Sequence, residues 1–155
     1  MLQPDPDGIT SNNFSPKRFD YLEQLSILAT RKKNSADRIT RNSKIFKSII
    51  RAIQVKKGEN IISLDLRKIP EAVTDFFVIC QASSTTQVKA ISDSVQDFVK
   101  IECGETAFRH EGQQAAQWVL IDYVNIVVHV MQAETRKFYK LEDMWSDAPI
   151  TTHNS

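Results

Sequence analysis

The residues with the clearest chemical potential are four hydroxyl side chains in a row, at Ser83–Thr86. They precede a helical pattern, and groups at a helix N-terminus can bind an anion such as phosphate. A phosphate-transferring site would also need two carboxylates, spaced two residues apart, to hold a divalent metal ion. Asp65 and Asp122 are the nearest acidic candidates, and neither has such a partner. Helix capping is the favoured interpretation, because Ser84 and Gln87 fit a capping box.

Other reactive side chains lack suitable partners. Cys80 lies inside an apolar segment, where a packing role is favoured over that of a nucleophile. His110 and Glu111 are adjacent, and adjacent strand residues point to opposite faces, which argues against an acid–base pair. The histidines show no metal-ligand spacing, and no hydrolase or glycine-rich phosphate motif is present. We therefore expect a protein that is not an enzyme and that uses no cofactor or metal ion.

Composition indicates one ordinary folded domain. The chain has 155 residues, of which 41% are hydrophobic and 25% charged, and its formal net charge is +1. This balance provides no broad basic field, so it favours a protein partner over naked nucleic acid. Two cysteines without metal-site spacing fit a reducing compartment. No run approaches the ~18 apolar residues of a membrane span, and no secretory signal is evident, so we expect a cytoplasmic protein with no membrane association.

Hydrophobic periodicity divides the chain into three parts. Residues 1–42 are expected to be a flexible extension with a short helix at 17–30, residues 43–149 a single domain, and residues 150–155 a disordered tail. The expected elements of the domain are a helix from Ser43 to Gly58, strands at 61–66 and 75–81, a helix from Ser84 to Gly104, strands at 106–110, 118–123 and 126–131, and a helix at 134–145. The last helix is expected to be amphipathic, with an apolar stripe formed by Phe138, Leu141, Met144 and Trp145. This order predicts an α/β (α+β) domain with a mixed sheet of about five strands flanked by helices.

The last two strands are expected to form a hairpin with a two-residue turn at Val124–Asn125. Tyr123 then pairs with Ile126, and one face of the hairpin is apolar. Such a turn is unfavourable for Val124, because β-branched residues avoid positive φ. The other face carries a mixed set of side chains: Trp118, Leu120, Asp122, Val127, His129 and Met131. This face is either covered by a helix or partly exposed to a partner, and a core or rim position is slightly favoured for Trp118.

Two long segments resemble the ribosomal silencing factor (Iojap-like) family. The first, DFFVICQASSTTQVKAISDSV at Asp75–Val95, resembles one family signature, and the second, WVLIDYVNIVVHVMQAETRKFYKLEDMWSDAP at Trp118–Pro149, resembles another. The sequence HEG at His110–Gly112 matches a loop of the family. The family commonly has Gly-Asp at the hairpin turn, where this chain has Val124–Asn125, and a glycine or an acidic residue where this chain has Gln117. The resemblance covers about residues 43–149.

The resemblance implies a fold related to nucleotidyltransferases but without their metal-binding carboxylates. It also implies binding to the large ribosomal subunit through large-subunit ribosomal protein fourteen, which sterically blocks joining of the small subunit and lowers translation when nutrients are scarce. The family's partner-binding surface corresponds here to Glu111, Gly112, Trp118, His129, Met131, Glu134, Arg136 and Tyr139. The alternative is a divergent nucleotidyltransferase-like nucleotide-binding protein, with Ser83–Thr86 on phosphate and Asp122 on a metal ion.

Two features are left open by the sequence. The N-terminal extension has a basic cluster that could contact ribosomal RNA, although a solvated linker is favoured. The cluster consists of Arg31, Lys32, Lys33, Arg38 and Arg41. The oligomeric state is also open, and a homodimer is one of the states that the sequence allows.

Overall fold

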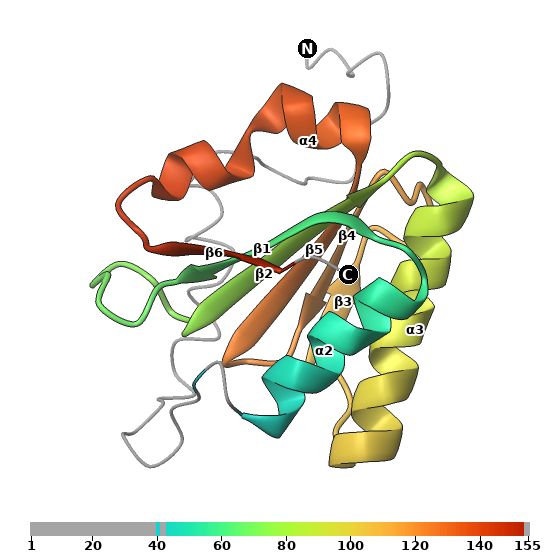
Figure 1. Ribbon diagram of the computed structural model, residues 1–155, viewed down its shortest axis with the longest axis horizontal. Coiled ribbons are helices and arrows are strands. Elements are labelled where there is room, and N and C mark those ends of the chain that lie inside the picture. The colour runs from blue at the N-terminus through green and yellow to red at the C-terminus, as the bar shows by residue number, and fades with distance from the viewer. Residues whose placement is uncertain (1–39, 41–42, 154–155) are drawn as a thin grey trace, which may run out of the picture.

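The computed structural model describes Thr40 and residues 43–153, which form a twisted sheet with helices on both faces (Figure 1). The helix expected at 17–30 and the basic cluster of the extension lie outside the described residues. In chain order the elements are α2 (Lys44–Val55), β1 (Glu59–Asp65), β2 (Phe76–Ala82), α3 (Thr85–Cys103), β3 (Arg109–Glu111), β4 (Trp118–Asp122), β5 (Ile126–Gln132), α4 (Ala133–Tyr139), the 3-10 helix η4 (Leu141–Trp145) and β6 (Ile150–His153).

The sheet is mixed and has six strands in the order β3-β4-β5-β2-β1-β6. Strands β2 and β5 run parallel, and the other neighbouring pairs are antiparallel. The expected α/β class is confirmed, with one strand more than expected. Parallel β2 and β5 end at the same edge of the sheet, and the helices that follow them, α3 and α4, pass to opposite faces.

The additional strand, β6, corrects the expectation of a disordered tail for residues 150–153, and residues 154 and 155 lie outside the described residues. None of its residues is buried, and three of the four are polar, so the segment lacks the apolar signal of a buried strand. Their pairing is nevertheless specific. The carbonyl of Pro149 accepts a 2.9 Å hydrogen bond from the amide of Asp65, and the Ser63 hydroxyl lies 2.8 Å from Nε2 of His153. Cross-strand hydrogen bonds, rather than apolar burial, therefore hold this edge strand.

Helices α2 and α3 begin and end close to where sequence signals place them. Ser43 is the N-cap residue of α2, although its hydroxyl accepts from the amide of Thr40 rather than from a helical amide. Ser84 caps α3 by accepting a 3.1 Å hydrogen bond from the amide of Gln87. Gly104 adopts the left-handed conformation that commonly ends a helix. The expected capping role of the hydroxyl row is thus confirmed for Ser84.

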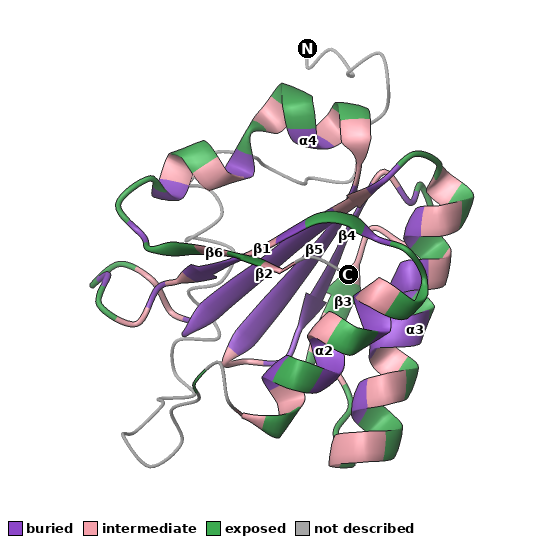
Figure 2. Ribbon diagram, viewed as in Figure 1, coloured by how far each residue is buried: buried purple, intermediate pink, exposed green. Residues whose placement is uncertain are grey.

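Each face of the sheet has its own apolar core (Figure 2). One core joins α2 and α3 to the apolar face of the hairpin, which includes Val119, Ile121 and Val128. The other joins η4 to the mixed face, with Leu141 and Trp145 fully buried against the sheet. Burial of both faces explains why β2 and β5 are almost continuously apolar, because a strand covered on both sides needs no polar alternation.

The single helix expected at 134–145 is two elements. Lys140 has a φ of 51°, and this left-handed residue ends α4 and redirects the chain into η4. The change of direction lets Leu141 and Trp145 reach the second core. Phe138 was expected on the same apolar stripe, but its side chain is 75% exposed. The sequence contains no glycine or asparagine at position 140 to signal this break.

The hairpin register agrees with the prediction. The amide of Tyr123 donates to the carbonyl of Ile126 at 2.8 Å, and Trp118 lies opposite Met131. The predicted strain at the turn is also observed, because Val124 has a φ of 75°. Strand β3 is shorter than expected, since residues 106 and 107 precede the point where the amide of Phe108 first bonds the carbonyl of Asp122, at 2.7 Å.

Candidate functional site

The mixed face of the hairpin is built around a buried pair of side chains. The indole Nε1 of Trp118 donates a 3.0 Å hydrogen bond to Nδ1 of His129, and the ring of Phe77 meets the His129 ring edge-on at 4.7 Å. Burial lowers the pKa of His129 to about 3, because a charged imidazole would lose its hydration there. His129 is therefore neutral at physiological pH, with Nδ1 acting as the acceptor.

Three of the expected partner-binding side chains lie beneath the surface. Trp118 is 4% exposed, and His129 and Met131 are fully buried. The ring of Tyr139, on α4, packs 5.3 Å from the ring of Trp118. Of the two interpretations of the mixed face, the structure shows the helix-covered one, with Trp118 in the core. These three side chains support the surface from below and do not present atoms to a partner in this conformation.

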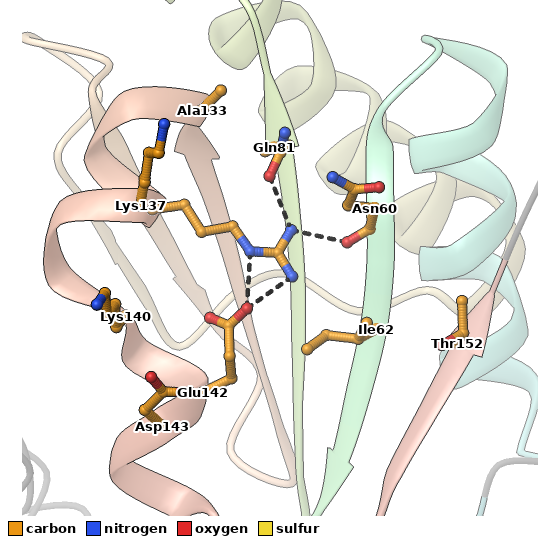
Figure 3. Close-up of a pocket in the computed structure, with 10 residues that line it drawn as sticks. Asn60, Ile62, Gln81, Ala133, Lys137, Lys140, Glu142, Asp143 and Thr152 are labelled. Atoms are coloured by element: carbon orange, nitrogen blue, oxygen red, sulfur yellow. Dashed lines mark hydrogen bonds and ion pairs between the residues drawn. The ribbon is translucent and has the colours of Figure 1, made fainter.

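Arg136 is also buried and fixes the position of α4 (Figure 3). Its Nη1 donates to the backbone carbonyl of Asn60 at 2.7 Å and to Oε1 of Gln81 at 3.3 Å. Its Nε and Nη2 both lie 3.1 Å from Oε2 of Glu142. One guanidinium therefore joins α4, η4, β1 and β2. Sequence alone assigned Arg136 to partner binding, and its structural role depends on contacts between residues far apart in the chain.

The loop after β3 meets the other side of Trp118. Gly112 has a φ of 91°, and a side chain there would collide with the backbone carbonyl of Trp118, so only glycine fits. Glu111 is partly exposed and forms an ion pair with Arg109 at 2.5 Å. Gly112 thus lies against Trp118, whereas Glu111 ends β3 opposite Leu120 and keeps part of its side chain exposed.

The exposed part of the region is provided by α4. Glu134, Lys137 and Phe138 are spaced three and four residues apart and are all exposed, so they share one helix face, and Tyr139 beside them is half-buried. We call these four residues the α4 surface. A cleft of about 680 Å³ adjoins it, and Figure 3 shows the residues that line it. The lining residues are Asn60, Ile62, Gln81, Ala133, Arg136, Lys137, Lys140, Glu142, Asp143 and Thr152.

The alternative nucleotide site is not assembled by the fold. The hydroxyl row follows the carboxyl end of β2, whereas Asp122 pairs with Val127 near the start of β5, at the other end of the sheet. Five residues along the strands separate the hydroxyl row from the level of Asp122, a distance of roughly 16 Å. The Asp122 carboxylate accepts a 2.7 Å hydrogen bond from the amide of Val124 instead. Within the described part of the chain, no group of three or more histidine, cysteine or carboxylate side chains is placed to hold a metal ion.

Comparisons with known proteins agree with the resemblance seen in the sequence. Residues 39–155 match the family described as ribosomal silencing factor during starvation. Two similar proteins are named ribosomal silencing factor RsfS. The one from Bacillus subtilis is 39% identical over 106 residues (68% of this chain, 88% of that protein), and the one from Halalkalibacterium halodurans is 37% identical over 108 residues (70% and 91%).

A solved structure supports the same relationship. A crystal structure of a protein from Chromobacterium violaceum has a TM-score of 0.63 and 36% identity to this chain, and the alignment covers 66% of this chain and 84% of that one.

Among the described residues, no helix is both long enough and apolar enough to cross a membrane.

Proposed function

The chain belongs to the ribosomal silencing factor family, and from this premise we propose that it binds the large ribosomal subunit and prevents joining of the small subunit. In this proposal the chain binds large-subunit ribosomal protein fourteen, the target that the family resemblance implies, at the face where the subunits meet. It acts in the cytoplasm and lowers translation when nutrients are scarce. The action is steric and requires no catalysis.

The observation that carries the proposal is the family match over residues 39–155, which includes every helix and strand among the described residues. A steric blocker needs a rigid body with one contiguous docking surface. Both requirements find support here, because the sheet is covered on both faces and α4 is fixed to it by Arg136. The expected binding residues with exposed surface are the partly exposed Glu111, at the end of β3, and those on the α4 surface.

These exposed parts form a single region because both adjoin Trp118. The loop contacts the backbone of Trp118 through Gly112, and α4 contacts its ring through Tyr139. Buried Trp118, His129 and Met131 thus hold two separate segments in a fixed relative position. We assign direct partner contact to the exposed groups and a supporting role to the buried ones.

Co-sedimentation with purified subunits tests this proposal. The chain is mixed separately with large and with small ribosomal subunits, and the amount that pellets is measured over a range of chain concentrations. We expect saturable pelleting with large subunits only. Equal pelleting with both subunits, or none with the large one, would show that the proposed function is wrong.

A further inference from the structure

We propose that Phe138 is the main anchor of the docking surface and inserts into an apolar pocket on a protein of the large ribosomal subunit. This inference rests on the proposed function and identifies the contact that carries its affinity. Phe138 was expected in the core, yet it is the more exposed of the two exposed phenylalanines among the described residues, at 75% against 52% for Phe108. Exposed aromatic rings are enriched at the cores of protein interfaces, so this ring is a candidate anchor for a partner.

Two further aromatic rings support the ring of Phe138. It meets the ring of Tyr139 at 4.8 Å in an edge-on arrangement, and Tyr139 in turn packs on Trp118 at 5.3 Å. Trp118 is itself held by the hydrogen bond to His129. The three rings therefore continue from the core to the surface. Binding through such a supported ring requires little ordering, which favours affinity.

The charges around Phe138 favour a protein pocket over RNA. The exposed ionic side chains on α4 and along the adjoining cleft are Glu134, Lys137, Lys140 and Asp143. These are two cations and two anions, so their charges cancel. Arg136 adds no free cation, because Glu142 pairs with it. A polyanion would need a net positive surface, whereas an apolar anchor with a mixed polar rim is the usual anatomy of a protein interface.

The test compares substitutions at Phe138 in the full chain, using binding to purified large subunits. Phe138→Ala is expected to lower affinity about thirtyfold, the effect of removing a typical hot-spot side chain. Phe138→Leu should retain affinity within about fivefold, because an apolar pocket accepts an aliphatic group of similar size. Ile101→Ala is the matched control, since Ile101 is 81% exposed on α3, on the opposite face of the sheet, and should bind as the wild type does.

The outcomes separate the inference from the proposed function. If the wild type binds and Phe138→Ala binds equally well, the inference is overturned while the proposed function stands. If Phe138→Leu loses as much affinity as Phe138→Ala while Phe138→Trp retains it, stacking on a nucleobase replaces the protein pocket, and the inference is overturned. If the wild type fails to bind large subunits, both the inference and the proposed function are overturned. Melting temperatures equal to that of the wild type confirm that the variants are folded.

Discussion

At the scale of single residues, the pair formed by Trp118 and His129 shows how a polar contact can lie inside an apolar core. The indole N–H would be costly to bury without an acceptor, and neutral His129 supplies one. The period-two pattern correctly predicted that both residues share a face, and that Trp118 lies opposite Met131. Whether that face was covered depended on η4, whose contacts with β2 join positions far apart in the chain.

Trp118→Ala should therefore act mainly on folding. Loss of a buried indole, with the cavity that it leaves, typically costs about 3–5 kcal/mol of unfolding free energy. Urea unfolding followed by circular dichroism measures this cost. A variant that keeps wild-type stability and loses only ribosome affinity would show that Trp118 is an exposed contact residue, contrary to the structure.

His129 should make stability depend on pH. Its pKa is about 3 in the folded chain and about 6.5 when exposed, so between these values the unfolded state binds a proton that the folded state does not. The stabilisation from keeping His129 neutral is complete above pH 6.5 and is lost as pH falls toward 3, with a slope of at most about 1.4 kcal/mol per pH unit.

The measurement compares His129→Leu, which cannot titrate, with the wild type from pH 7 to pH 4.5. The difference in unfolding free energy should shift in favour of the variant as pH falls. His110→Gln replaces an exposed histidine and provides the control for loss of an imidazole from the surface. Parallel pH curves for the wild type and His129→Leu would contradict the burial of His129.

At the scale of elements, the buried side chain of Arg136 stabilises α4 more than the helix-forming tendency of the α4 sequence does. The helix has only seven residues, and isolated helices of that length are unstable in water. Arg136 compensates by linking α4 to Asn60, Gln81 and Glu142. Sequence periodicity predicted a helix here, but it could not locate the break at Lys140, which no glycine marks. The exposure of Phe138 and the burial of Arg136 both follow from that break.

Arg136→Met should loosen α4 while keeping a side chain of similar length. The variant removes the donor that Arg136 supplies to the Asn60 carbonyl and to the partly buried carboxylate of Glu142, which should cost about 2 kcal/mol. Lys137→Met is the matched control, because Lys137 is exposed and should change stability by less than about 0.5 kcal/mol. Hydrogen exchange locates the effect, and faster exchange confined to segments outside α4 and η4 would argue against this role.

At the scale of the whole molecule, the sheet is a rigid support for a surface built from two distant segments. The order of most elements was predictable, because two capped helices and the apolar strands carry strong local signals. Strand β6 was not predictable, because three of its four residues are polar and it is held by pairing with β1. The location of the docking region stays a prediction, and the structure divides the residues assigned to it into buried and exposed ones, which the sequence could not do.

We propose that the bound chain keeps the ribosomal subunits apart. Large subunits are incubated with increasing amounts of the chain, small subunits are added, and the joined ribosomes are quantified on a density gradient. We expect the joined peak to fall as the chain saturates the large subunit, with the chain sedimenting only with free large subunits. An undiminished joined peak that contains the chain would contradict the account, because the protein would then bind without blocking.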